Sequence, residues 1–519
     1  MGDQEKDMRA KLVILGFYSA GIIVGGGILA LPFVAMDTGS IMLILLLIAF
    51  GLIFYVIYNR MLDSISACLR GVSVIKPGLV LYDAGLIESG LEKYGKLAFT
   101  IGILLYVVPA DIVYILYGLK SLIQLSSYVN YYQIYQVLFI GLVVMFIVSV
   151  LFMRFRKLVL ISDASSYELV LKLLLMISIW VLTIGLLKYA CCSEIKIAMG
   201  ASAFALSLII GEFFPERFKK ASISMPVAED VLPRHKAGAY MSVFKLLLIT
   251  LTPFLAFLII ASRASLSTNI PLFPRSLQSL VAATTIIIFM YVGSGIYNIL
   301  VYDWIINHME RGKKVTLIAI TASLIAYLVF SILILLSVDP VILINSNLRR
   351  EHAFIALARK LEAIGITELG LLVIIMANIF ALVSVSVAFL GFTDTLSDRL
   401  ELDLKVNRNL VWTLVAILIT SIVVTLEVFD VTRIATDALG IAGNAGGGLF
   451  ILILPWLIKD SKNRRRIPLA IAFLLLVTLL DISMILNSIT FVAFCASTLA
   501  TILVLFFGIL AILEAMKNA

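Results

Sequence analysis

The chain has 519 residues, of which 62% are hydrophobic and only 14% are charged, and its mean hydropathy is +1.11. A soluble globular protein could not cover this much apolar surface, so the composition excludes that class and predicts an all-α polytopic membrane protein with one transmembrane domain, 1–519. The formal net charge is +8, but the basic residues are divided among short loops, which argues against a nucleic-acid partner.

A helix needs about 20 apolar residues to cross a lipid bilayer. The polar start of the chain leads into an apolar run that is too long for a signal peptide, and no cleavage site follows it. The pattern predicts fourteen membrane spans, in chain order 11–35, 41–58, 97–123, 134–153, 169–187, 197–214, 241–261, 280–306, 315–336, 369–392, 410–426, 438–458, 467–485 and 491–513.

The distribution of Lys and Arg gives the orientation. If the N-terminus is cytoplasmic, most of the basic residues fall in inside loops, including the runs 154–157, 311–314 and 464–466. The positive-inside rule then predicts a multi-pass protein of the cell membrane with both termini cytoplasmic. Two longer polar segments remain. We expect a short amphipathic helix in the inside segment 64–96, and a surface helix at 349–361 in the outside segment 337–368.

Three consecutive glycines, Gly25, Gly26 and Gly27, lie in the middle of the first span. Each costs roughly 1 kcal/mol of helix propensity relative to alanine. Irregular backbone at membrane depth is tolerated only where it is buried in protein or lines a cavity. We therefore predict a broken helix, whose free N–H and C=O groups suit an amino acid zwitterion. The alternative is that the glycines allow close packing of helices.

A second glycine segment, Gly293-Ser294-Gly295, lies at the centre of span 280–306. This span runs in the opposite direction to the first one. Two glycine-interrupted helices of opposite direction are what an inverted repeat produces. We therefore expect a second break here.

Three motifs resemble those of the amino acid–polyamine–organocation superfamily, particularly its amino acid/auxin permease and hydroxy/aromatic amino acid permease branches. The segment Gly-Gly-Gly-Ile-Leu-Ala-Leu-Pro at 25–32 looks like the first-helix motif of these permeases. The segment 384–394 resembles their eighth core helix, and 442–448 with Leu454-Pro455 looks like their tenth. The order and spacing of the motifs extend this resemblance over most of the chain.

The resemblance implies a five-plus-five inverted-repeat bundle with broken core helices one and six. The first repeat would be 11–190 and the second 280–458, with 197–261 as an inserted helical hairpin and 467–513 as two peripheral C-terminal helices. A rival alignment stays open, in which 197–261 rather than 280–336 supplies core helices six and seven. It arises because 228–234 looks like the family's loop at that place.

The expected substrate site lies between the two glycine segments. Free N–H groups of the first segment would hold the substrate carboxylate, and carbonyls beside each segment, including those of 289–292, would hold its ammonium. Tyr291 and Ser294 would contact the side chain, unless Tyr291 is simply a core aromatic. The full expected set is Ile22, Ile23, Gly25, Gly26, Gly27, Ile28, Tyr291, Gly293, Ser294 and Gly295.

Lys172, Ser384 and Asp111 are the candidates for ion coupling. A lysine inside a span, as Lys172 is, is costly and usually functional, although it could also snorkel to the inner surface. The resemblance implies that such a lysine replaces a sodium ion between core helices one and eight. Ser384 matches one hydroxyl of a sodium site, but Val383 cannot supply the second. Asp111 would pair within the bundle or relay a proton, whereas Asp481 is expected nearer an interface.

These features predict a secondary active amino acid permease that works by alternating access with proton symport. Sodium coupling is one alternative. Another is a lipid or polysaccharide flippase, although only Lys172 and Lys245 are basic within the spans. An enzyme is not expected, because all three histidines fall in loops and no catalytic constellation appears. The four cysteines have no metal spacing, so neither a metal nor another cofactor is expected.

Overall fold

The computed structural model describes residues 2–68, 86, 89–128, 142–143, 164–219, 232–267, 269–300, 309–349, 351–404, 407–428, 434–458, 467–486 and 491–518. Within these ranges every regular element is a helix, as the composition predicts. The first elements are α1 (Gly2–Ile23), η1 (Gly26–Ala30), α2 (Leu31–Thr38), α3 (Ser40–Cys68), α5 (Tyr94–Tyr128), α7 (Ala164–Leu187), α8 (Ser193–Lys219), α9 (Leu232–Arg263) and α10 (Leu277–Leu300). They are followed by α12 (Met309–Ser337), α13 (Pro340–Leu348), α14 (Ala353–Ala363), α15 (Thr367–Leu404), α16 (Arg408–Val428), α17 (Ile434–Ile441), the π-helix η3 (Ala442–Ile453), α18 (Leu454–Ile458), α19 (Ile467–Leu486) and α20 (Phe491–Asn518).

The helices identify a multi-pass membrane protein. Nine helices within the described residues are long and apolar enough to cross a membrane, or ten if one bent pair counts as a span. Each expected span except 134–153 coincides with a described helix, and that one lies outside the described residues apart from 142–143. Large apolar side chains such as Leu52, Leu475 and Phe506 are exposed, which suits contact with lipid. The count of fourteen spans stays a prediction.

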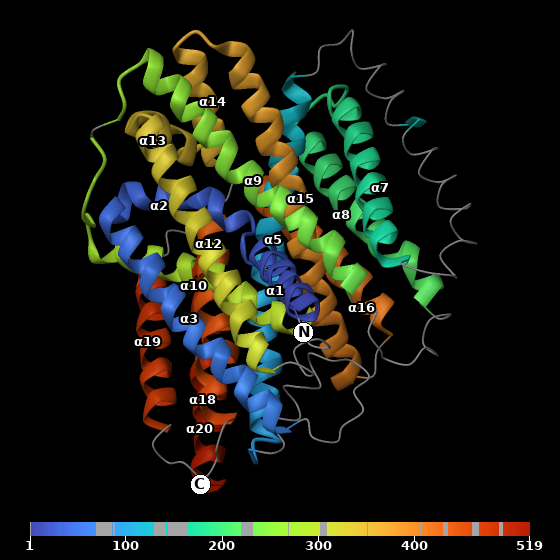
Figure 1. Cartoon of the computed structure of the whole chain (residues 1–519), viewed down its shortest axis with the longest axis vertical. Helices are drawn as coiled ribbons and strands as arrows, with labels where there is room; N and C mark the ends of the chain where they lie inside the picture. Colours follow the sequence, from blue (N-terminus) through green and yellow to red (C-terminus); the bar gives the residue numbers. More distant parts are fainter. Residues whose placement is uncertain are drawn as a thin grey trace. The chain divides into compact units, whose positions relative to one another are not determined.

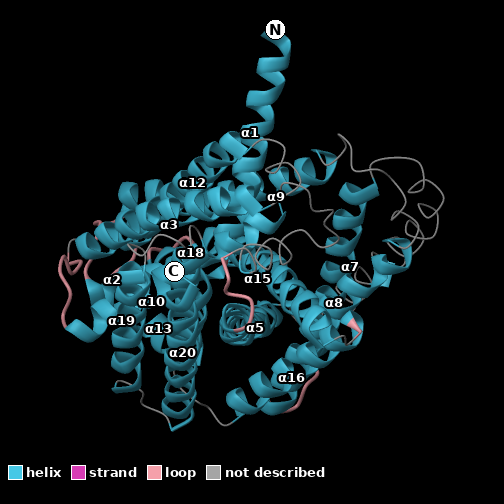
Figure 2. Cartoon of the chain, turned by 90° about the horizontal axis from the view of Figure 1, so that it is seen from below, coloured by secondary structure: helices cyan, strands magenta, loops and turns pink. Residues whose placement is uncertain are grey.

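The chain divides into two compact units. Unit 1 consists of Met1–Ala110, Ser242–Ile374 and Thr432–Ala519, and unit 2 of Asp111–Met241 and Ile375–Val431. In unit 1, α1 packs against α12 and α10, and the red helices α19 and α20 lie side by side (Figure 1). In unit 2, α8 packs against α7 and α16 (Figure 2).

The π-helix η3 forms a fully buried part of unit 1. Its glycines allow close approach of other backbones. A Cβ added to Gly446 would lie 2.3 Å from the backbone N of Tyr106, and one added to Gly443 would lie 2.4 Å from the Thr285 carbonyl oxygen. This glycine-rich segment is therefore required by packing, whatever else it does.

The end of α20 caps the start of α5, also within unit 1. The Glu514 carboxylate accepts hydrogen bonds from the backbone N–H groups of Tyr94 (3.0 Å) and Gly95 (3.1 Å). The Asn518 amide donates to the Gly90 carbonyl at 2.6 Å. The first N–H groups of a helix have no partner within the helix, so a distant carboxylate satisfies those of α5.

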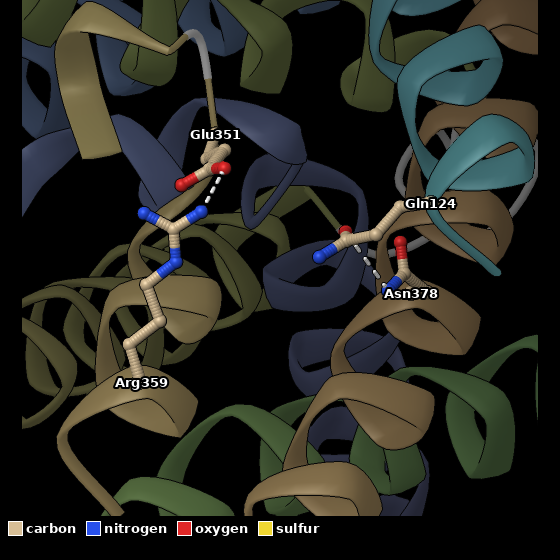
Figure 3. A network of polar contacts seen from close by, with 4 residues as sticks. All are labelled: Gln124, Glu351, Arg359 and Asn378. Carbon is tan, nitrogen blue, oxygen red and sulfur yellow. Dashed lines mark hydrogen bonds and ion pairs between the residues drawn. The ribbon is translucent and has the colours of Figure 1, made fainter. Parts of the chain in front are cut away.

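The expected surface helix at 349–361 is wrong. The segment forms α14, which packs against α12 and η1, and most of its residues are buried. Its charges are paired: Arg359 donates to Glu351 (Figure 3), and Lys360 Nζ lies 2.8 Å from an Asp339 carboxylate oxygen. An amphipathic pattern fits a protein groove as well as a surface, and here paired charges accompany the buried apolar face.

The described residues test two other expectations only in part. In the expected hairpin 197–261, α8 belongs to unit 2 and α9 from Ser242 onward belongs to unit 1. Whether this hairpin is an insertion between repeats stays a prediction, as do the repeat boundaries. The expected amphipathic helix in 64–96 lies mostly outside the described residues.

Candidate functional site

The first span is broken where the three glycines predict. Helix α1 ends at Ile23, Gly25 is extended with φ −91° and ψ −164°, and η1 begins at Gly26. The segments Leu12–Gly21 and Gly26–Thr38 meet at 54°. Pro32 then stands in the first turn of α2, where its missing N–H costs no hydrogen bond. The glycines thus end one helix and let another begin in a new direction.

The amide side of the break is buried. Gly26, Gly27 and Ile28 are all inaccessible, and the Ile28 N–H lies 3.5 Å from the Gly25 carbonyl oxygen. A Cβ on Gly27 would lie 3.0 Å from Met290 Cγ on α10. Gly27 therefore serves close packing as well as the break, so the two explanations of this glycine segment both hold.

The carbonyl side of the break is satisfied by side chains from other helices of unit 1. Lys245 Nζ on α9 donates to the Gly21 carbonyl at 2.8 Å, and Tyr327 Oη on α12 donates to the Ile23 carbonyl at 2.9 Å. Ser323 Oγ makes a longer contact of 3.5 Å with the Ala20 carbonyl oxygen. Three carbonyls near the end of α1 thus receive side-chain donors, although the Ala20 carbonyl also keeps its helical hydrogen bond from the Val24 N–H at 2.8 Å.

This arrangement changes the expected role of Ile23. Its carbonyl oxygen accepts from Tyr327 and also from the Gly25 N–H at 2.9 Å. A carbonyl oxygen has two lone pairs, so a ligand ammonium would have to displace one of these donors. Ile22 lies in the last turn of α1, and its side chain is outside the described residues.

The lysine that contacts the first span is Lys245, whereas sequence reasoning assigned the coupling role to Lys172. Lys245 is 7% exposed. Lys172 lies in α7 of unit 2, and its side chain is outside the described set. The two lysines stand at similar depths near the starts of their spans, so hydropathy could not separate them. Ser242, one turn before Lys245, also lies against Gly21, but nothing in the sequence alone marks this contact.

The second expected break is absent. Helix α10 runs without interruption through Gly293, Ser294 and Gly295. The side chains beyond Val292 are outside the described set, so the expected Ser294 contact stays a prediction. A Gly-x-Gly segment permits a break but does not impose one, because each residue can still make its helical hydrogen bond.

Tyr291 is a packing residue in this structure. It is fully buried, and its hydroxyl donates to the Leu47 carbonyl on α3 at 3.1 Å. Its ring stacks on Phe54 and meets Tyr327 edge-on, each with ring centroids 5.7 Å apart. The core-aromatic alternative therefore describes Tyr291 better than contact with a substrate.

The two glycine segments share one detail of their surroundings. Tyr58 Oη on α3 donates to the Tyr291 carbonyl at 2.8 Å. Tyr291 stands two residues before Gly293, just as Ile23 stands two residues before Gly25. Each segment thus has a tyrosine hydroxyl on the equivalent carbonyl, donated by the long helix that follows the other segment.

The remaining candidates lie in unit 2. Asp111 is buried and accepts a hydrogen bond from Thr393 Oγ1 at 2.8 Å, while its other carboxylate oxygen has no partner among the described residues. Ser384 is also buried, and its hydroxyl has no partner within the same set. Nine residues of α15 separate Ser384 from Thr393, about 13 Å along the axis. Asp111 and Ser384 therefore do not form one site.

Two polar pairs accompany them in unit 2. The Asn378 amide donates to Gln124 Oε1 at 3.3 Å (Figure 3), and Lys120 forms an ion pair with the buried Glu427. Asp111 is thus one member of a set of polar contacts between helices, which suits the pairing explanation. Because one Asp111 oxygen has no partner among the described residues, a proton relay through Asp111 also stays a prediction.

The sequence matches no known protein-family model, and it has no significant match among curated proteins. No group of three or more His, Cys, Asp or Glu in the described part of the chain could hold a metal ion. The class that the structure defines is a polytopic α-helical membrane protein whose first span is broken and held by side-chain donors.

Proposed function

We propose that the chain is a secondary active transporter of amino acids, which works by alternating access and is coupled to protons. The observation that carries this proposal is the hydrogen bond from Lys245 to the Gly21 carbonyl, at the break of the first span. An ionisable residue at membrane depth is a functional candidate by default. Here Lys245 of α9 donates to α1, the helix whose broken backbone suits a ligand.

The proposed carboxylate site is the start of η1. Backbone N–H groups of Gly26 and Gly27 begin this five-residue segment, and N–H groups at a helix start attract anions, while the Ile28 N–H would exchange its long contact with the Gly25 carbonyl for the substrate carboxylate. Gly27 leaves little spare room, because a Cβ there would already meet Met290. This tightness favours a small group such as a carboxylate over a larger anion.

The proposed ammonium site is the Ile23 carbonyl, from which the substrate displaces Tyr327. Tyr327 belongs to α12, so loss of its bond frees α1 from α12 at that point. Binding of substrate would then change the contacts between two helices. A ligand shifts a conformational equilibrium only when its contacts differ between the states, and this exchange of donors supplies such a difference.

Lys245 supplies the proposed coupling. As an ammonium it donates to Gly21 and ties α9 to α1. As an amine it is a weaker donor, so the tie loosens when the proton leaves. Proton binding thereby favours the arrangement in which α1 and α9 are joined. This replaces Lys172 in that role, while Ser384 remains the candidate for the alternative of sodium coupling.

The reciprocal tyrosine bonds support the five-plus-five repeat. In such a repeat, α1 and α3 correspond to α10 and α12. Tyr327 on α12 donates to α1, and Tyr58 on α3 donates to α10, at equivalent carbonyls. We therefore propose that 293–295 is a second hinge, which is helical in the state described here and opens in another state of the cycle.

The test is uptake into proteoliposomes with a panel of amino acids, with proton and sodium gradients imposed separately. The parent should accumulate one class of amino acid under the proton gradient alone. Lys245→Met should abolish accumulation and keep exchange of substrate, whereas the matched variant Lys172→Met should accumulate like the parent. Loss of accumulation in Lys172→Met alone would overturn the role of Lys245. Failure of the parent with every amino acid under both gradients would overturn the function.

A further inference from the structure

A second buried ionisable group lies in unit 1, away from the break. Asp481 on α19 is 3% exposed and Asn444 on η3 is fully buried, although Asp481 was expected near an interface. Glycines let α19 pack closely on η3 and on the end of α17: a Cβ on Gly440 of α17 would lie 2.4 Å from Met484 Cε, and one on Gly448 of η3 would lie 2.6 Å from Val477 Cγ2. Asp481 stands between these two contacts on α19 and so faces η3 opposite Asn444.

The hydrogen bonds of this pair are incomplete. The Asn444 amide nitrogen donates to Met484 Sδ at 3.5 Å, and the Asn444 side chain also bonds to the Asp481 carboxyl. One oxygen of each residue, Asp481 Oδ2 and Asn444 Oδ1, has no partner among the described residues. An ionised carboxylate and an amide oxygen are both acceptors only. They cannot satisfy each other, and an unpaired buried charge is costly.

No described charge near Asp481 compensates a carboxylate. In α10, η3, α18 and α19, Asp481 is the only charged residue among those described. On α17, the acid Asp437 lies roughly 10 Å along the axis from Asn444. On α20, Glu514 is engaged at the start of α5 and Lys517 lies in the last turn. Among the described residues, the elements packed against α19 therefore supply no cation that would hold Asp481 in its ionised form.

A single proton on Asp481 would give both unpartnered oxygens a hydrogen bond. A carboxylic acid has an O–H donor, and the Asn444 carbonyl oxygen is the acceptor that it lacks. A metal ion fits less well, because a hard cation such as Ca²⁺ takes six to eight oxygens and only two side-chain oxygens are free here. We propose that Asp481 and Asn444 form a proton-binding site, in which Asp481 is a neutral carboxylic acid that donates to Asn444.

The site lies between a π-helical segment and a neighbouring span. π-helical turns in membrane and soluble proteins occur frequently at functional sites. Loss of the proton leaves a bare carboxylate between η3 and α19, so that their packing depends on the proton. This inference is independent of the coupling role of Lys245, since the two sites share no residue.

The test is infrared spectroscopy of the full-length protein in lipid at neutral pH, where a protonated carboxyl gives its own C=O band. Asp481→Asn should remove one such band, and the control variant Glu194→Gln, at a fully exposed acid whose pKa is lowered by hydrogen bonds, should remove none. Asn444→Leu should keep the band but shift it, because the acid loses its acceptor. A spectrum of Asp481→Asn that matches the parent in this region would overturn the proposal.

A second measurement does not depend on a folded variant. A hydrophobic carbodiimide reacts with protonated carboxyl groups inside membranes, so it should label Asp481 of the parent at neutral pH, as found by peptide mass spectrometry. Labelling should fall as the pH is raised. Absence of label at Asp481 when other buried acids are labelled would overturn the site. Loss of the infrared band on adding sodium at constant pH would also overturn it, in favour of a cation site.

Discussion

The glycine segments at 25–27 and 293–295 have similar sequences and opposite structures. The first separates two helices that meet at 54°, and the second lies in an uninterrupted helix. Both have a tyrosine hydroxyl on the carbonyl two residues upstream. Only the first has Lys245 on Gly21, and only the first is followed by a proline that restarts a helix. Glycine allows the break, and the surrounding donors decide where it is stable.

The reason is the free-energy cost of backbone N–H and C=O groups that lack hydrogen-bond partners in an apolar interior. A helix satisfies its own carbonyls, whereas each end leaves several without partners. An unsatisfied buried amide group costs about 1–3 kcal/mol by mutation. At the first break, Lys245 and Tyr327 donate to the Gly21 and Ile23 carbonyls, whereas the Ala20 carbonyl keeps its helical hydrogen bond from Val24. In α10 the uninterrupted helix supplies hydrogen bonds to its own carbonyls, and Tyr58 adds a second bond to the Tyr291 carbonyl.

The largest effect is expected from Gly21→Ala. The added Cβ would lie 2.0 Å from Ser242 Oγ and 2.7 Å from the Ser242 Cα. Because the Cα belongs to the backbone, α9 must move away and the Lys245 bond must break. Overpacking of this kind costs about 1–3 kcal/mol or more. Thermal unfolding in detergent should show a marked loss, together with loss of proton-driven uptake.

The matched control is Gly27→Ala, whose Cβ would lie 3.0 Å from the flexible Met290 side chain and in ordinary contact, 3.7 Å, with Phe289. It should cost less than Gly21→Ala. Equal unfolding temperatures for Gly21→Ala and the parent would mean that α9 does not hold the break.

Removing one tyrosine hydroxyl should affect the two segments to a similar degree. Tyr327→Phe leaves the Ile23 carbonyl with the Gly25 N–H as its donor, and Tyr58→Phe leaves the Tyr291 carbonyl with the hydrogen bond of an uninterrupted helix. Each change should cost about 0.5–1.5 kcal/mol. Denaturation of the two variants in parallel measures the difference. A clearly larger loss in Tyr327→Phe would show that the Gly25 N–H does not satisfy the Ile23 carbonyl.

The second hinge can be tested by strengthening its helix. Gly293→Ala should stabilise a helical α10 by about 1 kcal/mol. If 293–295 must open during the cycle, the same variant should transport more slowly while it unfolds at a higher temperature. Uptake rate and unfolding temperature are measured on one preparation. Unchanged uptake in the stabilised variant would indicate that α10 stays helical throughout.

The smallest effect concerns α14, the helix that packs against η1 at the first break. Burial raises the pKa of Glu351 above its ordinary value of 4.5, although the neighbouring Arg359 lowers it. A raised pKa means that the folded state favours the protonated acid. This contribution to stability is complete below pH 4.5 and is lost as the pH rises through the raised pKa. Hydrogen exchange in α14, corrected for its intrinsic rate, should therefore quicken over that range.

Glu351→Gln should remove this dependence on pH, because the amide does not titrate. Glu194 is a matched control, since it is fully exposed and hydrogen bonds lower its pKa. Glu194→Gln should leave the exchange of α14 unchanged. A pH profile of α14 that persists in Glu351→Gln would assign the effect to another group.

The sequence predicts the apolar helices and the first break, because hydropathy and three adjacent glycines act locally. It does not predict that α10 stays helical, since Gly293 and Gly295 have the same intrinsic freedom as the glycines of the first span. Nor does it separate Lys245 from Lys172, because both lie near the start of an apolar run. The burial of α14 was also missed, because an amphipathic segment does not reveal what covers its apolar face.

The capping of α5 by Glu514 has a consequence for biosynthesis. The carboxylate and the Tyr94 amide that it caps are 420 positions apart in the chain. At a synthesis rate of 5–20 residues per second, α5 waits about 20–80 s for its cap. During that time its first N–H groups depend on water or lipid headgroups. Release of the α20 segment from the ribosome is thus a late step that completes a helix inserted much earlier.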